Sequence, residues 1–570
     1  MTTAPRQQCD VLIVGTGAGG LSTAIVAKKH GLDVLVIEKE ACFGGTTAFS
    51  GGVLWVPGNP HAAKAGIEDT REAAVTYLRH EAGNFYNEAA VEAFLDNGPR
   101  MLEFFERETE VQFVLSGYPD YHPDAPGGAR IGRSVTAKAY DATRLGPELK
   151  RLRMPLETIT FIGMMFNSSN EDLKHFFRAT SSLTSATYVA KRLANHLKDL
   201  AIHRRGVQIT SGNALVARLA KSAFDLGIPI LTGTEARGLD IENGAVRGMT
   251  VRDATGERLI VARKAVVLAS GGYPHDTGKL AASYPHVARG GQHMSPTPDS
   301  NTGDGIRMAE AAGARFEAGY PNAAAWMPVS QVPLGKGRTG VFPHLVDRYK
   351  PGVIAVNGKG RRFTNEANSY HDVGAAMIRE SEDGSPAMAW LICDHATIRK
   401  YGLGYAKPAP VPVSTYLRNG YLQSGATIAE LASTIGLDPH ALEETVRRYN
   451  EGAARGEDPE FGRGSTAFNR FLGDPDHKPN PNVAPVGKGP YYALKLLMGD
   501  LGTFNGLVTD TVGRVLGEDA APIPGLYAVG NDRASIMGGN YPGAGITLGP
   551  IMTFGYITGR HLADAEDARA

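Results

Sequence analysis

The apolar pattern near the N-terminus predicts a strand, a helix and a second strand in immediate succession. Residues 9–14 form a continuous apolar run of buried-strand length, the stretch 21–31 has helical spacing, and residues 33–38 form another apolar run. A glycine-rich turn, 15–20, joins the first strand to the helix. This order is the βαβ unit of a Rossmann-type nucleotide-binding domain.

The glycine-rich turn and the end of the second strand predict a bound dinucleotide. Three spaced glycines allow a tight turn, close approach of the backbone to a pyrophosphate and close packing of helix on strand, and the helix N-terminus supplies amides and a partial positive charge. Glu38 is placed to accept hydrogen bonds from a ribose, which argues against a 2′-phosphate and for FAD or NAD. The contacts expected from this unit are Gly15, Gly17, Ala18, Gly19, Gly20, Glu38 and Lys39.

Later segments favour FAD over NAD. Residues 43–52 form a glycine and hydroxyl stretch that looks like the loop along the flavin in FAD domains of glutathione-reductase type. The runs 265–272 and 523–531 predict strands that end in glycine, and the second closes on a Gly-Asn pair where the ribityl chain would lie. From Gly545 onward the pattern predicts a helix whose N-terminus would face the flavin pyrimidine. The further expected contacts are Gly44, Gly45, Thr46, Thr47, Ser50, Gly51, Gly52, Ser270, Gly271, Gly272, Asn301, Gly303, Asp304, Gly530, Asn531, Gly545, Ile546 and Leu548.

Composition narrows the class of protein. The chain has 570 residues, which is too long for one compact core, so two domains are expected. Lys+Arg and Asp+Glu are both 59, which makes nucleic acid an unexpected partner. Three scattered cysteines do not suggest a disulfide framework or a metal cluster, so we expect no metal and a reducing, cytoplasmic location. The N-terminus resembles neither a signal peptide nor a membrane span.

The middle of the chain differs in composition from both ends. Residues 289–488 hold loops rich in Pro, Asn and Gly, with helical stretches at 426–437 and 438–456. This block interrupts the FAD domain, which is expected to comprise 1–288 and 489–570, and it is the natural substrate cap. The predicted fold class is therefore α+β: an α/β Rossmann-type FAD domain of glutathione-reductase type, interrupted by an α+β cap domain.

The cap carries motifs of a known superfamily. The stretches 301–305 and 352–367, in this order along the chain, resemble the succinate dehydrogenase and fumarate reductase flavoproteins. In fumarate reductases an arginine that binds carboxylate and delivers a proton stands four positions after the motif's Glu, here Glu366; this chain has Tyr370 at that position. A phenol cannot pair bidentately with a dicarboxylate as Arg does, so the chemistry departs from that of fumarate reductases.

The chain instead resembles the 3-ketosteroid Δ1-dehydrogenases of the same superfamily. The resemblance rests on residues 118–121 with 132–134, on 499–503 with 506–510, and most specifically on the YPGAG sequence at 541–545. Many family members have YPGPG, and the Ala at the fourth position leaves the following glycine amide in place.

This resemblance implies a mechanism and site residues. The hydroxyl of Tyr541 and the amide of Gly545 would bind the 3-keto oxygen as an oxyanion hole. Tyr370 would take the C2 proton with help from Tyr121, although Tyr118 lies close enough in sequence to be the true partner. The C1 hydride would pass to N5 of a non-covalently bound FAD, since residues 43–52 lack the histidine that tethers FAD in succinate dehydrogenases. An external acceptor, a quinone or similar carrier, would reoxidise the flavin.

Three alternatives stay open. A Δ4-ketosteroid or non-steroidal cyclic ketone dehydrogenase or ene-reductase fits the same superfamily, and a non-catalytic flavin-binding module is a rival from another class.

The segment of about 140–205 is expanded relative to the shorter dehydrogenases, with a basic stretch at 149–155 and an apolar run at 158–165. It predicts either a helical hairpin packed on the FAD domain or an exposed patch in peripheral contact with a membrane, from which a steroid would be drawn.

Overall fold

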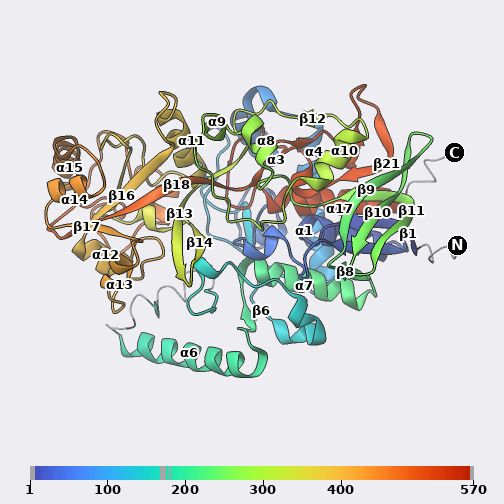
Figure 1. The fold of residues 1–570 in the computed structure, drawn as a ribbon, viewed down its shortest axis with the longest axis horizontal. Coiled ribbons are helices and arrows are strands. Elements are labelled where there is room, and N and C mark those ends of the chain that lie inside the picture. Colours follow the sequence, from blue (N-terminus) through green and yellow to red (C-terminus); the bar gives the residue numbers. More distant parts are fainter. Residues whose placement is uncertain (1–6, 167–174, 177–178, 180–181, 565–570) are drawn as a thin grey trace.

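Two separate β-sheets organise the molecule, one at each end of its long axis (Figure 1). The structure is a computed structural model, and it describes residues 7–166, 175–176, 179 and 182–564. Both ends of the chain lie beside the first sheet, whereas the second sheet is built from the middle of the sequence (Figure 1).

The first sheet has a parallel core in the order β20-β21-β11-β1-β2-β8. Only β20 pairs in antiparallel fashion along this path, and β9 and β10 extend the sheet from β11. The strands predicted from the apolar runs all occur here, which confirms the predicted parallel sheet. The strands are β1 (Gln7–Val14), β2 (Val34–Glu38), β8 (Ile230–Thr232), β9 (Glu235–Glu242), β10 (Ala245–Asp253), β11 (Gly256–Leu268), β20 (Arg514–Leu516) and β21 (Pro522–Ala528).

Helices α1 (Ala18–Lys29) and α17 (Leu548–Asp564) pack against each other beside this sheet. Glycine allows their close approach, because a Cβ at Gly555 would lie 2.8 Å from Ser22 Oγ and one at Gly559 would lie 2.7 Å from Val26 Cβ. The other elements of this part are η1 (Thr46–Phe49), β3 (Val53–Trp55), α2 (Pro60–Lys64), α3 (Arg71–Ala82), η2 (Gly83–Phe85), α4 (Glu88–Glu108), β4 (Phe113–Leu115), β5 (Ser134–Ala137), β6 (Tyr140–Asp141), β7 (Gln208–Ile209), α7 (Ser211–Asp225), α8 (Thr277–Ser283), α9 (Pro285–Ala288), α10 (Asp304–Ala311) and η6 (Gly530–Asp532).

The second sheet is antiparallel, in the order β14-β13-β18-β16-β15 with β17 added to β18. The two helices predicted at 426–437 and 438–456 are present as α14 and α15, and Asp438 caps α15 as expected. The elements are β13 (Ala324–Gly335), β14 (Arg338–Pro343), η5 (Asp347–Tyr349), β15 (Ile354–Val356), α11 (Tyr370–Glu380), β16 (Met388–Asp394), α12 (His395–Tyr401), α13 (Ser414–Arg418), β17 (Gln423–Gly425), α14 (Ile428–Thr434), α15 (Pro439–Ala453), α16 (Ala467–Phe471) and β18 (Tyr491–Thr503); the pair β12 (Phe316–Glu317) and β19 (Gly506–Leu507) forms a separate ladder.

The strand β18 differs from the predicted domain boundary. A boundary after residue 488 assigns β18 to the FAD domain, but β18 hydrogen-bonds β13 and β16 and is the central strand of the second sheet. Most of its residues are buried, because helices and loops of the second part cover it. The chain therefore returns to the first part only after Thr503.

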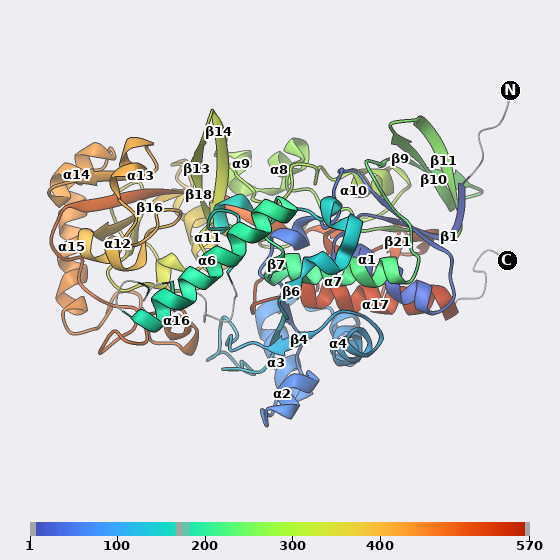
Figure 2. The same ribbon diagram turned by 90° about the horizontal axis from the view of Figure 1, so that it is seen from below.

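The described residues of the segment 140–205 include one long helix and two stretches of 3-10 turn. Helix α6 (Leu183–His203) runs along the outside of the molecule (Figures 1 and 2), and the turns are η3 (Ala142–Arg151) and η4 (Glu157–Ile159). The predicted helical hairpin and the alternative membrane-contacting patch fall partly on residues 167–174, 177–178 and 180–181, which lie outside the described residues, so both stay predictions. Leu183 and Leu197 of α6 are exposed. Within the described part of the chain, no helix is long and apolar enough to cross a membrane.

A buried ionic cluster fixes the loop that leads into α11. Arg362 Nε donates to Glu366 Oε1 over 2.7 Å, and Arg362 NH1 donates to Asp458 Oδ1 over 2.8 Å. Arg463 NH1 lies 3.3 Å from Glu366 Oε2, and the Ala355 amide donates to Glu366 Oε1 over 3.1 Å. Burial alone raises the pKa of Glu366, but the two guanidinium groups hold it below its ordinary value. These contacts fix Glu366, and with it the short loop that leads from Glu366 to Tyr370 at the start of α11.

Replacing Glu366 by Ala should destabilise the protein by about 3–5 kcal/mol, because two buried guanidinium groups lose their shared carboxylate. Thermal unfolding followed by circular dichroism measures the change. Glu460→Ala is the matched control, since its carboxylate lies 3.8 Å from Arg362 and its side chain is 38% exposed. Equal losses of stability in the two variants would show that the buried carboxylate of Glu366 does not stabilise the protein through this cluster.

Candidate active site

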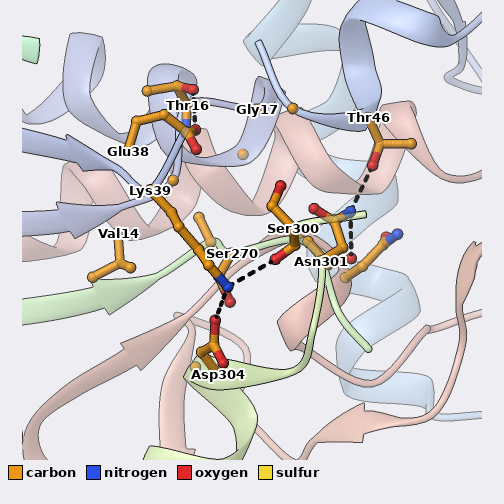
Figure 3. Close-up of a pocket in the computed structure, with 18 of the residues that line it drawn as sticks. Val14, Thr16, Gly17, Glu38, Lys39, Thr46, Ser270, Ser300, Asn301 and Asp304 are labelled. Atoms are coloured by element: carbon orange, nitrogen blue, oxygen red, sulfur yellow. Dashed lines mark hydrogen bonds and ion pairs between the residues drawn. The ribbon is translucent and has the colours of Figure 1, made fainter. Parts of the chain in front are cut away.

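A large cavity lies at the carboxyl ends of the parallel strands β1, β2 and β11 (Figure 3). Its volume is about 900 Å³, including space open to solvent. Many residues expected to contact a dinucleotide line it, and they come from segments far apart in the sequence. They are Gly15, Gly17, Ala18, Gly19, Glu38, Lys39, Gly45, Thr46, Thr47, Ser270, Gly271, Asn301, Gly303, Asp304, Gly530 and Asn531.

The remaining expected contacts lie outside the wall of this first cavity. Several are glycines needed by the protein's own packing: a Cβ at Gly20 would lie 2.1 Å from Gly15 O, and one at Gly52 would lie 2.3 Å from the carbonyl carbon of Ser211. Ile546 lines a second cavity described below. The residues not in the first wall are Gly20, Gly44, Ser50, Gly51, Gly52, Gly272, Gly545, Ile546 and Leu548.

Polar contacts tie the loops of the first cavity together. Glu38 accepts hydrogen bonds from the amide and hydroxyl of Thr16 (Figure 3), and burial raises the pKa of its carboxyl group. Lys39 Nζ lies 2.8 Å from Asp304 Oδ2, and Asn301 Nδ2 donates to Thr46 Oγ1 over 2.8 Å.

The first cavity fits a dinucleotide. Gly17, the N-cap of α1, has no side-chain cap, and the helix N-terminus favours an anion, although its first amide, that of Ala18, already donates to Thr47 Oγ1 over 3.0 Å. Glu38, at the end of β2, is placed to accept hydrogen bonds from a ribose, and the segment at Gly530 forms another part of the cavity wall. Glycine-lined walls leave room for a ligand that lies along several loops.

Sequence reasoning missed several lining residues. Thr16 and Thr302 lie inside the stretches 15–20 and 301–305 but were not singled out there, and Thr234 and Ser300 lie in no motif. Arg153 comes from the basic stretch 149–155, and it lines the first cavity with its guanidinium 5.5 Å from the Phe49 ring centroid. No sequence signal separated this arginine from the neighbouring basic residues.

Three tyrosines predicted to act in catalysis meet in one buried cluster. Tyr121, Tyr370 and Tyr541 are 7%, 7% and 4% exposed. The Tyr121 hydroxyl donates to the Tyr370 hydroxyl over 3.2 Å. The ring of Tyr541 stacks on Tyr121 at 5.5 Å and meets Tyr370 edge-on at 5.1 Å. Tyr118 instead packs on Phe471 at 4.7 Å, so the phenol that reaches Tyr370 is Tyr121.

The loop 541–545 is held by its carbonyl oxygens. The Pro542 oxygen accepts from the Tyr121 amide over 2.8 Å and from the Tyr77 hydroxyl over 2.6 Å. The Gly545 oxygen accepts from the Trp55 amide over 3.0 Å. By contrast, the buried Gly545 amide donates to no acceptor within the described part of the chain. It is therefore free to bind an oxygen brought in from outside.

Only glycine fits at position 545. Its φ is +96°, and a Cβ there would lie 2.5 Å from the Val53 oxygen and 2.7 Å from the Trp55 amide nitrogen. The close approach to β3 sets the direction of the free amide.

A buried charged pair positions the loop before Tyr121. Asp120 accepts from Trp55 Nε1 over 2.7 Å and from Arg133 NH1 over 2.7 Å, and Arg133 also lies 2.9 Å from Asp69. Burial raises the pKa of Asp120 to about 6, although Arg133 opposes the shift. The predicted segments 118–121 and 132–134 are thus joined by this pair.

Burial sets the protonation of the phenols. The pKa of Tyr370 lies well above its ordinary value because burial removes water and the neighbouring phenols Tyr121 and Tyr541 would repel a phenolate. Burial likewise raises the pKa of Tyr541. Both are neutral hydrogen-bonding groups at neutral pH.

A second cavity lies between the first cavity and the tyrosine cluster. Its volume is about 390 Å³, including open space, and Gly530, Asn531 and Ile551 line both cavities. Phe504, another wall residue, lies 6.2 Å from Tyr541 between ring centroids. The second cavity therefore shares part of its wall with the first, and a ring in that wall packs near Tyr541.

Comparison with known proteins agrees with this arrangement. The family model described as FAD binding domain matches residues 10–548. The chain is 44% identical over 568 residues to 4-oxocyclohex-2-ene-1-carboxylate 5-dehydrogenase of Sinomonas cyclohexanicum, covering 98% of this chain and 95% of that protein. It is 37% identical over 582 residues to 3-oxosteroid 1-dehydrogenase of Mycobacterium tuberculosis, covering 99% and 100%.

A solved structure shares the whole fold. The 3-ketosteroid Δ1-dehydrogenase of Sterolibacterium denitrificans, in complex with 1,4-androstadiene-3,17-dione, is 35% identical, with a TM-score of 0.89 over 98% of this chain and 100% of that one. The chain belongs to the family of FAD-binding domain proteins, and its cofactor is FAD.

Proposed function

We propose that this protein is an FAD-dependent dehydrogenase of cyclic ketones that introduces a carbon–carbon double bond beside the carbonyl group. The observation that carries the proposal is the buried cluster of Tyr121, Tyr370 and Tyr541 next to the free amide of Gly545. Bound FAD supplies the hydride acceptor, and an external carrier would reoxidise it. The chain's own residues must bind the ketone and remove the proton.

The ketone oxygen is the first requirement. Removing a proton beside a carbonyl places negative charge on its oxygen, so two donors directed at that oxygen lower the barrier. The hydroxyl of Tyr541 and the amide of Gly545 are the donors we assign to this role. Both are buried, which strengthens their interaction with a developing charge.

The proton acceptor is the second requirement. We assign it to Tyr370, whose hydroxyl accepts a hydrogen bond from Tyr121. Because burial raises the pKa of Tyr370, the phenolate that would take the proton needs a hydrogen-bond donor, and the Tyr121 hydroxyl is that donor. The three phenols are uncharged, so an apolar substrate ring can pack against them without facing an unpaired charge.

Two substrate classes have support. The YPGAG loop and the likeness to 3-oxosteroid 1-dehydrogenases favour a 3-ketosteroid that is oxidised to its 1-ene. The higher identity to a 4-oxocyclohex-2-ene-1-carboxylate 5-dehydrogenase favours a monocyclic keto acid, a non-steroidal cyclic ketone. Both share a six-membered ring with one ketone, and that ring is what the proposed donors recognise.

Anaerobic mixing of the holoprotein with single ketones should bleach the flavin absorbance near neutral pH. The panel comprises a 3-ketosteroid saturated at C1–C2, 4-oxocyclohex-2-ene-1-carboxylate, and cyclohex-2-ene-1-carboxylate as the matched compound without a ketone. Bleaching by either ketone and not by the control supports the reaction, and the faster ketone identifies the substrate class. If neither ketone bleaches the flavin, the proposed reaction is wrong.

Replacing Tyr541 by Phe should lower turnover by roughly a hundredfold or more, because one oxyanion donor contributes about 3 to 4 kcal/mol. Flavin content should not change, as read from the ratio of flavin to protein absorbance. Tyr118→Phe, which alters a phenol outside the cluster, should keep turnover close to that of the wild type. Unchanged turnover in the Tyr541 variant would show that the Tyr541 hydroxyl is not a donor to the ketone oxygen.

Replacing Tyr370 by Phe should stop removal of the C2 proton and, with it, transfer of the C1 hydride. In D2O the wild-type enzyme should exchange deuterium into C2 of the ketone if proton removal is reversible, and mass spectrometry of recovered substrate measures the label. The variant should incorporate none, although binding of the dienone product should still shift the flavin spectrum. Exchange at the wild-type rate would assign the base to another residue, with Tyr121 first to be tested.

A further inference from the structure

Arg533 is a buried cation without an anionic partner. Its side chain is almost fully covered, at 7% exposure, and its NH1 atom is buried with no hydrogen-bond partner. No carboxylate of the described residues lies within ion-pair distance of it. Burial lowers its pKa to about 10, which still leaves the guanidinium charged at neutral pH.

Some of the other buried arginines have carboxylate partners, and others donate to backbone carbonyl oxygens. Arg133 pairs with Asp69 and Asp120, and Arg362 pairs with Glu366 and Asp458. Arg205, Arg218 and Arg348 donate to backbone carbonyl oxygens and have no carboxylate of the described residues within ion-pair distance. Arg533 differs from these arginines because it lines a cavity, where a bound ligand would supply an acceptor for its unpartnered NH1 atom.

The surroundings of Arg533 point to the flavin. It lines the second cavity together with Asn531, Ile546 and Thr547, the last two lying immediately before α17. Its guanidinium lies 3.3 Å from the centroid of the Phe554 ring, which orients the planar group against α17. The cavity thus combines an unpaired cation with the positive end of a helix, and both favour negative charge at the same place.

We propose that Arg533 is the counter-ion of the reduced flavin, holding the negative charge that develops on the pyrimidine ring at N1 and O2. These two neighbouring acceptors lie in one plane, which suits the fork of a guanidinium. The residue stabilises reduced over oxidised FAD, and so raises the reduction potential available for oxidising the ketone. The inference depends on the flavin placement proposed above and not on which ketone is the substrate.

The two-electron midpoint potential of the holoprotein, measured by equilibration with a reference dye, tests the proposal without any substrate. Arg533→Gln should favour the oxidised flavin by at least tenfold, equivalent to a potential lower by about 30 mV for a two-electron couple. Arg533→Lys keeps the positive charge, so its midpoint potential should fall by less than that of Arg533→Gln. Arg514→Gln removes a cation whose side chain is 44% exposed and paired with Asp510, and it should leave the potential unchanged.

Binding of FAD to the apoprotein in each redox state completes the test. Arg533→Gln should bind oxidised FAD nearly as the wild type does and reduced FAD at least tenfold more weakly. Equal loss of both forms, or an unchanged potential, would overturn the proposal. An unchanged potential with turnover reduced only for a carboxylated ketone would make Arg533 a substrate-carboxylate residue instead. Failure of the panel of ketones would leave these potentials unaffected, so the two proposals fail separately.

Discussion

The backbone of the 541–545 loop is fixed through its carbonyl oxygens, and the geometry of the proposed reaction depends on that constraint. With Pro542 and Gly545 accepting hydrogen bonds from Tyr121 and Trp55, the amide of Gly545 is left free. The positive φ of Gly545 and its contact with β3 then set where that amide points. Because the Tyr121 backbone is bonded to the same loop, main-chain contacts and not flexible side chains set the spacing of the two phenols.

Two buried ion pairs order the loops that carry the phenols without contacting the phenol rings through their charged groups. Asp120 and Arg133 pair beneath the loop of Tyr121, and Arg362 and Glu366 pair beneath the start of α11. Each pair is buried and satisfied, so it orders a loop without placing a net charge against an apolar ring. This separation explains how a cluster of neutral phenols is supported by nearby ionised groups.

Sequence alone predicted the FAD domain well, because its signals are local. The strand of Leu12, the turn at Gly17 and the acid at Glu38 follow one another within a single βαβ unit. The boundary at 488 misplaced β18, since a long buried strand carries no mark of the sheet it joins. Arg153 and Arg533 were missed for a similar reason: each lines a cavity, and only the tertiary structure reveals where a cavity lies.

The proposed proton acceptor and its helper come from different parts of the molecule, so their contact requires docking of the second part on the first. Tyr370 begins α11, and His122 beside Tyr121 bridges Asp372 of that helix at 3.1 Å and Glu81 of α3 at 2.8 Å. Burial lowers the pKa of His122, but the two carboxylates raise it to about 10, so the imidazole is charged at neutral pH. An ionic bridge at the margin of the phenol cluster thus holds α11 against the loop of Tyr121, and the hydrogen bond between the two phenols is a consequence of that docking.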